Sequence, residues 1–144
     1  MESMTTEMPV ASGAIQKAGN YEWPGVPIKE YKPGVSLDVT RRTLIESNTT
    51  QFEVRYFEVG VGGHTSFEKH LHEHCVVVIR GAGEVRLEDE WQEISLNDTV
   101  YVGPMVPHQF KNTGAEPFGI LCVVDRNRDR PIHLDPDGNP QTSE

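Results

Sequence analysis

Histidines dominate one short stretch of this chain, "HLHEHCVVVIRGAG", which runs from residue 70 to residue 83. In an extended strand alternate side chains point to the same face, so His70, His72 and His74 are expected to point the same way. Neutral imidazole is a common ligand for Mn, Fe, Co, Ni, Cu and Zn. A solvent-facing strand is the alternative, but the apolar run that follows directly must be buried. The spacing therefore predicts a metal site.

A fourth histidine lies in "VYVGPMVPHQFKN", residues 100–112. His108 follows a proline-rich turn and begins a predicted strand, so it can meet the other histidines across a barrel. We therefore predict four metal ligands: His70, His72, His74 and His108. In the alternative arrangement His74 swings out, and the other three histidines bind the metal together with water molecules. His64 and His133 are predicted to be ordinary surface or turn residues.

Cys122 lies in a predicted apolar strand, "FGILCVVD", residues 118–125. If its side chain points into the barrel, the thiol lies near the metal and is a candidate nucleophile. The alternative is a small buried core residue, which is the usual role of a lone cysteine in an apolar strand. Cys75, next to His74, would point away from the metal. Two cysteines are too few for a disulfide framework, and we expect both to be reduced.

The elements that must position these residues are short strands, separated by turns rich in glycine, proline, asparagine and aspartate. Eight candidate strands follow one another along the chain, at residues 36–46, 52–59, 75–80, 84–89, 91–96, 99–103, 108–112 and 118–125. Hardly any segment has the periodicity of a helix. Short strands at this spacing are typical of an antiparallel sandwich or barrel, and we predict an all-β fold.

Both ends of the chain differ in composition from its middle. Residues 1–20 are polar, small and aperiodic, which predicts a flexible, extended N-terminal arm. Residues 21–35 contain three prolines among aromatic residues, and we expect an extended segment docked on the domain. The prediction is one domain over residues 21–128, followed by a polar C-terminal tail over residues 129–144.

The net charge of −9 argues against a nucleic-acid partner, because a phosphate-binding surface needs a basic stripe. A few local arginines or lysines can still hold one small anion. No apolar run reaches the roughly 18–20 residues of a membrane span, and the N-terminus lacks the pattern of a signal peptide. We therefore expect a cytoplasmic protein that binds small molecules and has neither nucleic-acid nor membrane partners.

The first histidine motif resembles that of the cupins. In that family a glycine precedes His-x-His, and a glutamate and a closing glycine follow. The corresponding residues here are Gly63, His70, His72 and Gly81, with His74 where the family usually has glutamate. The resemblance therefore implies an all-imidazole shell without a built-in carboxylate base.

The second cupin motif is a proline-glycine turn followed by histidine and asparagine. His108 and Asn112 match it, while Met105 stands where the family usually has glycine. Asn97 takes the glycine position of another cupin turn, since asparagine tolerates positive φ better than most residues. The resemblance covers roughly residues 35–125, and it implies a double-stranded β-helix, the cupin form of the jelly-roll barrel.

Longer stretches, "FEVRYFEVGVGGH", "EKHLHEHCVVVIRGAG", "PMVPHQF" and "LCVVDRNRDRP", resemble the cupin 1-methylthio-D-xylulose 5-phosphate methylsulfurylases. This resemblance implies a manganese enzyme of methionine-salvage sulfur metabolism, with Fe(II), Ni(II) or Zn(II) as the alternative metals. The enzyme would remove the methylthio group from a sugar phosphate with a low-molecular-weight thiol such as glutathione. In this interpretation Cys122 is the catalytic nucleophile, with a pKa lowered by a nearby cation.

Several points stay open at this stage. Five basic residues are equal candidates for binding the phosphate: Arg41, Arg42, Arg55, Lys69 and Lys111. An Fe(II)-dependent cupin dioxygenase, in which Cys122 is dispensable, fits the same histidines. A non-catalytic cupin that binds a small molecule fits them as well. We expect a homodimer, because small cupins bury their sheet edges by pairing.

Overall fold

The computed structural model describes residues 13–141. Residues 1–12 of the predicted arm and residues 142–144 of the predicted tail lie outside this range. Every regular element within it is a β-strand, which confirms the predicted all-β fold. The strands are β1 (Ile28–Glu30), β2 (Leu37–Ile45), β3 (Phe52–His64), β4 (Glu68–Lys69), β5 (His74–Arg80), β6 (Gly83–Leu87), β7 (Glu90–Ile94), β8 (Thr99–Val102), β9 (His108–Lys111), β10 (Phe118–Asp125) and β11 (Ile132–His133). Over residues 13–141 there is no helix that could cross a membrane.

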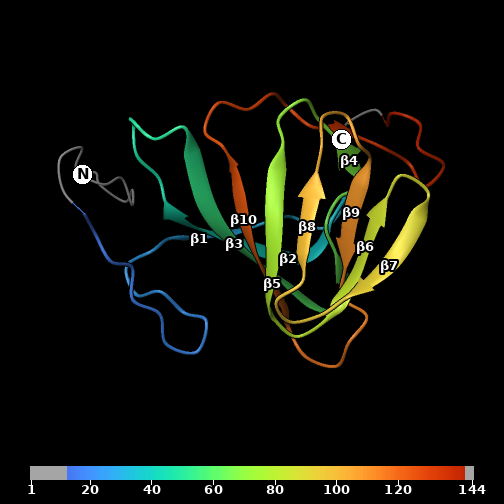
Figure 1. Ribbon diagram of the computed structural model, residues 1–144. Coiled ribbons are helices and arrows are strands. Elements are labelled where there is room, and N and C mark those ends of the chain that lie inside the picture. The colour runs from blue at the N-terminus through green and yellow to red at the C-terminus, as the bar shows by residue number, and fades with distance from the viewer. Residues whose placement is uncertain (1–12, 142–144) are drawn as a thin grey trace.

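The strands pair antiparallel in one sheet that curls round on itself (Figure 1). One wall holds β1, β2, β3, β10, β5 and β8, in this order. The other wall holds β7, β6, β9, β4 and β11. The two walls share a ladder at the end of the long strand β3, where His64 pairs with Lys111. The result is the jelly-roll barrel that the sequence predicted.

The main hydrophobic core fills the interior of the barrel with alternate residues of its strands. Val76 and Val78 on β5 are buried, as are Cys122 and Val124 on β10. In a strand with one buried face, every second side chain points into the core. Cys122 therefore points inward, whereas Cys75, the neighbour of Val76, lies on the outer face of β5.

A smaller apolar cluster covers the outer face of the first wall. Tyr21, Trp23 and Val26 pack there around Tyr56, which is fully buried. The rings of Trp23 and Tyr56 lie with their centroids 4.9 Å apart. The segment at residues 21–35 thus begins by docking on the barrel, as predicted.

All eight predicted strands are present, but three short ones were missed. They are β1, β4 and β11, each two or three residues long. A pattern of alternating polarity cannot be recognised over so few residues. The omission matters for function, because β4 and β11 form the part of the second wall that carries His70.

Among the residues with backbone torsions in the left-handed region, three lie in turns close to the histidine motifs. Asn97 has φ 74°, which confirms that it takes the place of a turn glycine. Met105 has φ 61°, and its amide N–H donates to the carbonyl of His70 at 2.7 Å. Gly81, at φ 68°, ends the strand that His74 begins.

Replacing Gly81 by alanine is expected to lower the free energy of unfolding by about 3 kcal/mol. The new Cβ would have an unfavourable φ and would also lie 2.4 Å from the carbonyl oxygen of Pro117. Gly62 is the matched control, because its φ is +82° but nothing lies within 4 Å of an added Cβ. Gly62→Ala should therefore cost only about 1 kcal/mol in urea unfolding. Equal losses in the two variants would refute the steric part of this argument.

Candidate metal centre

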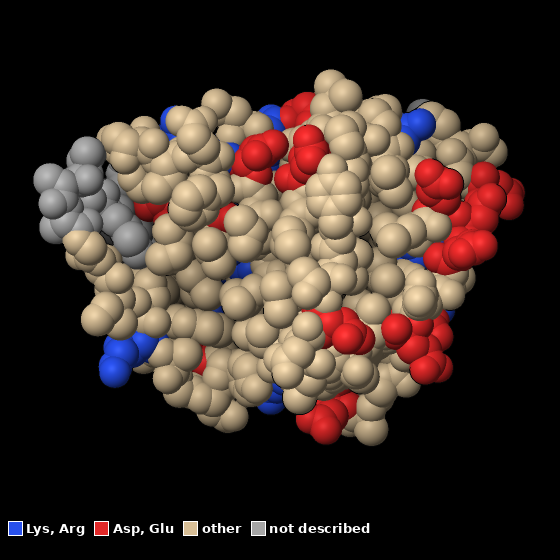
Figure 2. Space-filling view, in the orientation of Figure 1, with Lys and Arg blue, Asp and Glu red and all other residues tan. Residues whose placement is uncertain are grey.

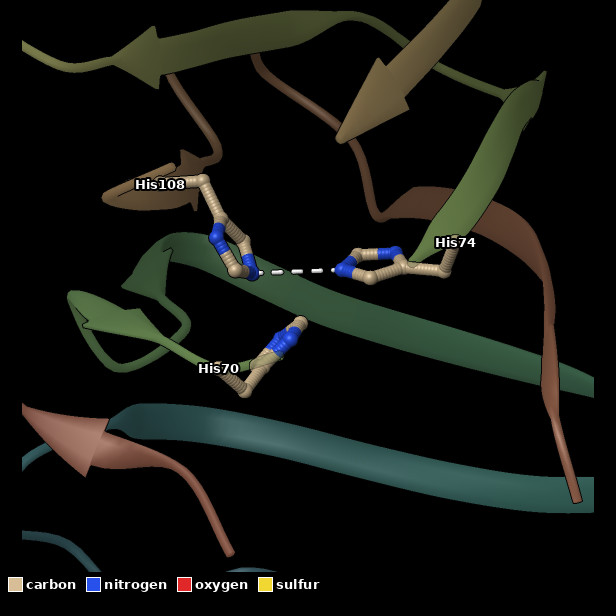
Figure 3. Close-up of side chains that lie close together, drawn as sticks. All are labelled: His70, His74 and His108. Carbon is tan, nitrogen blue, oxygen red and sulfur yellow. Dashed lines mark hydrogen bonds between the residues drawn. The ribbon is translucent and has the colours of Figure 1, made fainter. Parts of the chain in front are cut away.

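Three histidine side chains meet inside the barrel (Figure 3). His70 follows β4 and His108 begins β9, so both come from the second wall, whereas His74 begins β5 in the first. One ring nitrogen of each histidine lies within 4.8 Å of the others. His70 is 2% exposed and His108 is 4% exposed. These three predicted ligands can hold one divalent metal ion, and His74 does not swing out.

His72, the fourth predicted ligand, lies beside this set. Its ring stacks on that of His70, with centroids 3.7 Å apart and planes at 3°. Its ring nitrogens are not part of the group that converges within 4.8 Å. His72 nevertheless lines the same cavity, and it stays a prediction as a ligand.

The prediction that one strand carries His70, His72 and His74 was wrong. Only His74 lies in a strand, and residues 70–73 form the crossing from β4 to β5. β4 pairs with β9 in the second wall, and β5 pairs with β10 in the first, so the chain must leave one ladder to reach the other. The rings come together because this crossing turns toward the cavity.

The hydrogen bonds of the four rings leave one nitrogen of each available to a metal. The Nδ1–H groups of His70 and His108 donate to the carbonyl oxygens of His72 and Val106, at 2.8 and 2.9 Å. The Nδ1 of His72 bonds the carboxylate of Asp129 at 2.8 Å, and that of His74 lies 3.5 Å from the Cys122 sulfur.

In His70, His74 and His108 this arrangement directs Nε2 toward the common centre, and the other nitrogen is held by a second partner, as is usual for metal-binding histidines. The Nε2 atoms of His74 and His108 face one another at 3.2 Å (Figure 3). The donor set of three neutral imidazoles suits Mn, Fe, Ni or Zn. The residues present therefore fit a transition-metal ion.

Burial favours the neutral form of His72, His74 and His108. The pKa of His74 is lowered to about 2, first by burial and then by the neighbouring histidines. Burial also lowers the pKa values of His72 and His108, although Asp129 opposes this at His72. Neutral imidazole is the form that binds a metal, so the site is ready to bind at neutral pH.

The metal-free protein should lose stability as the pH falls below about 6.5, the ordinary value for histidine. Below that pH the unfolded chain binds protons at His72, His74 and His108, whereas burial opposes their protonation in the folded protein. Each histidine that stays unprotonated in the fold lowers the free energy of unfolding by up to about 1.4 kcal/mol per pH unit. Urea unfolding with a chelator, from about pH 8 to about pH 5, measures this. His74→Gln should flatten the slope, whereas His64→Gln should keep it. A flat profile for the unsubstituted protein would contradict the prediction.

Two residues near the metal centre were missed by the sequence analysis. A carboxylate oxygen of Glu68 lies 3.6 Å from His70 Nε2 and 3.9 Å from His108 Nε2. The converging group itself contains only imidazoles, and this carboxylate lies beside it. His133, predicted as a surface or turn residue, lies on β11 and lines the cavity, with its Nδ1 buried. Glu68 stands two positions before His70, so the alternation applied to the histidines was the signal that could have found it.

Cys122 lies within the same group of residues. Its sulfur is 3.5 Å from His74 Nδ1, and the residue is 4% exposed. Burial raises the pKa of its thiol to about 11, although the neighbouring guanidinium of Arg55 lowers it. Among the protein's own groups burial outweighs Arg55, and a lowering of the pKa by a bound metal ion stays a prediction.

All of these groups open into one cavity of about 690 Å³. That volume lies within the range of about 300–1,000 Å³ that is usual for small-molecule sites. Tyr31, Arg41 and Phe57 line it together with the histidines and Cys122. The cavity thus joins a metal site, a thiol and cationic groups. His64 lies in a second, neighbouring hollow with Gln109, away from the metal centre.

Asp129 holds the crossing that carries two of the histidines. Its carboxylate accepts hydrogen bonds from the amide N–H groups of Leu71 and His72, at 2.8 and 2.9 Å, as well as from the His72 ring. We expect Asp129→Asn to weaken metal binding about tenfold or more, because outer partners fix the ligand rings. Competition with a fluorescent chelator measures the affinity. Asp125→Asn, which removes the same charge from the exposed end of β10, should leave it unchanged; an equal loss there would point to a general charge effect.

The curled sheet and the histidines that converge inside it define a class of protein. A family model described as a cupin domain matches residues 55–124. The chain belongs to the cupin family.

Among its relatives is the 1-methylthio-D-xylulose 5-phosphate methylsulfurylase of Rhodospirillum rubrum. The two are 38% identical over 114 residues, which cover 77% of this chain and 73% of that protein. A crystal structure of a cupin-2 domain from the same organism has a TM-score of 0.78 and 33% identity, over 87% of this chain and 86% of that one. A cupin 2 conserved barrel domain protein from Rhodopseudomonas palustris also has a TM-score of 0.78, with 35% identity, over 88% and 89%.

Proposed function

We propose that this cupin is a metal-dependent methylsulfurylase that removes the methylthio group from 1-methylthioxylulose 5-phosphate with the help of a thiol. The observation that carries the proposal is the contact between the Cys122 sulfur and His74, which is itself one of three histidines that can hold a metal. The relative of that name, at 38% identity, supports the substrate. Sulfur metabolism, manganese, a cytoplasmic location and a homodimer belong to the same proposal.

The metal would be held by His70, His74 and His108, and we propose His72 as a further ligand. When bound, a divalent ion supplies a Lewis acid that polarises substrate oxygens and stabilises negative charge on them. The carboxylate of Glu68, within 4 Å of two of these rings, can add an oxygen ligand or accept a hydrogen bond at the site.

Cys122 would act on the sulfur of the methylthio group. A bond forms between the two sulfur atoms while the carbon–sulfur bond breaks, and its electron pair stays on carbon, which takes a proton to become a methyl group. Cys122 is left as a methyl disulfide. One external thiol then restores the Cys122 thiol by exchange, and a second releases methanethiol, so that two thiols are oxidised to a disulfide.

The surroundings of the sulfur determine how readily it reacts. Burial raises the pKa of Cys122 to about 11, so the thiol is protonated at neutral pH as long as only the protein's own groups act on it. The Arg55 guanidinium acts in the opposite direction, and His74 Nδ1 lies within contact of the sulfur. A buried thiol of this kind is protected from general oxidants and becomes reactive only when further positive charge enters the cavity.

The proposal is tested by measuring methanethiol release from 1-methylthioxylulose 5-phosphate, with manganese-loaded protein and glutathione. Release that requires both the metal and the thiol would support it. The absence of release from protein with confirmed metal content would overturn it. Oxygen uptake by iron-loaded protein with an organic substrate would then favour the dioxygenase, and ligand binding without turnover would favour a binding protein. The mass in light scattering tests the homodimer.

A further inference from the structure

Two arginine side chains from the first wall line the cavity. Arg41 lies on β2 and Arg55 on β3, and both face into the cavity. Arg42, the neighbour of Arg41, points to the opposite face and packs over the Tyr56 ring. Acidic side chains outnumber basic ones on the face of the molecule in Figure 2. Two other cations line the cavity, but Lys32 is exposed and Arg128 pairs with Glu53. In a chain with a net charge of −9, Arg41 and Arg55 therefore need an explanation.

Neither cation is neutralised by the protein. Within the part of the chain that the structure describes, no carboxylate oxygen lies within 4.0 Å of Arg41 or Arg55, whereas Arg80 and Arg128 pair with glutamates at 3.0 Å. The Nε atoms of both Arg41 and Arg55 are buried and lack a hydrogen-bond partner. A buried donor without an acceptor destabilises the fold, and the cost is larger when the group is charged. Such groups are retained where a ligand can supply the missing negative charge.

The strand register places these cations next to the proposed chemistry. Arg55 on β3 pairs directly with Cys122 on β10. On the other side of β10, Cys122 pairs with Val76 on β5, which lies two residues after His74. Arg41 lies on the far side of Arg55, opposite Phe57. From β2 to β5 across the wall, the side chains therefore follow in the order Arg41, Arg55, Cys122 and His74. Within this wall Arg41 therefore lies farther from His74 than Arg55 does.

We infer that Arg41 and Arg55 form an anion subsite that binds the phosphoryl group of the substrate. The phosphoryl group is expected on the Arg41 side, where Tyr31 orients the guanidinium by accepting a hydrogen bond from Nη1 at 3.2 Å. Two guanidiniums match a dianion with three free oxygens better than a single carboxylate. The choice of phosphate rests on the proposed function, whereas the presence of an anion subsite rests on the two arginines.

The test is a binding measurement that does not require turnover. Calorimetry on the manganese-loaded protein compares D-xylulose 5-phosphate with D-xylulose, which lacks the phosphate. We expect the phosphate to tighten binding at least about tenfold, since charge-assisted hydrogen bonds are among the strong ones. Arg41→Gln and Arg55→Gln should each remove most of that difference. Arg130→Gln, which removes one charge from an exposed residue outside the cavity, is the matched control and should retain it.

Further binding measurements test the anion subsite even if one of the glutamine variants fails to fold. Inorganic phosphate should compete with D-xylulose 5-phosphate for the unsubstituted protein, and Arg55→Lys should keep part of the preference, because it keeps the charge and loses the planar fork. D-fructuronate, a ketose that ends in a carboxylate, tests the other source of negative charge. Binding of D-fructuronate as tight as that of the phosphate would overturn the phosphoryl assignment.

The inference is overturned if the unsubstituted protein does not prefer the phosphorylated sugar, or if both glutamine variants keep the preference. Neither outcome depends on methanethiol release. A preference that is lost in both variants, in a protein that releases no methanethiol, would support the anion subsite and refute the methylsulfurylase.

Discussion

Cys122→Ser is expected to reduce methanethiol release by a factor of about 1000 or more while the metal content stays unchanged. A serine hydroxyl is nearly the same size as the thiol and can still accept a hydrogen bond from His74 Nδ1, so the ligand should stay in place. It cannot form the bond to the methylthio sulfur that the proposed reaction requires, because a hydroxyl is a far weaker nucleophile toward sulfur. Headspace detection of methanethiol, together with metal analysis of the same sample, measures both quantities.

Cys75→Ser is the matched control for this substitution. Cys75 is the other cysteine of the chain and lies on the outer face of β5, where its Cα pairs with that of Tyr101. It should keep full activity, since no step of the proposed reaction uses it. Full turnover by Cys122→Ser would remove the covalent step and leave Cys122 as a core residue.

His108→Ala is expected to abolish metal binding at micromolar concentrations. The variant lacks one of the three converging rings, and that ring is 4% exposed and held in place by a hydrogen bond to the Val106 carbonyl. For the unsubstituted protein, metal at about 100 times its dissociation constant should add about 2.7 kcal/mol to the free energy of unfolding. This stabilisation should vanish in His108→Ala. Metal analysis and thermal melting with and without manganese measure the two effects.

His64→Ala serves as the control, because that imidazole lies in the neighbouring hollow with Gln109. It should bind one metal ion and keep the full increase in melting temperature. A normal metal content in His108→Ala would show that the ion sits elsewhere. It would refute the three-histidine site and leave the barrel fold unaffected.

Much of this architecture could be predicted because its signals are local. Eight strands are visible as short apolar or alternating segments between turn residues, and Asn97 shows its turn by residue type alone. His108 follows a proline-rich turn, so its place at the start of a strand was also visible. The histidine spacing at residues 70–74 identified His70 and His74, although the single strand proposed to carry all three histidines does not exist.

The remaining features depend on contacts between residues far apart in the sequence. The crossing at residues 70–73 is shaped by Asp129, and only the closed barrel shows that Arg41 and Arg55, but not Arg42, reach the cavity. The pKa of Cys122 could not be inferred either, because burial and the charge of Arg55 act in opposite directions. Their balance depends on how deeply the strand is packed.

The origin of the three ligands in two different walls has a mechanical consequence. Among the described residues, the walls share a ladder where His64 pairs with Lys111. An ion bound to His70, His74 and His108 would therefore link the two walls at a second place. Any breathing motion that separates the walls would then have to break a coordination bond. The slow opening of the barrel and the escape of the ion would become one event, and the cavity would hold its shape for as long as the ion stays bound.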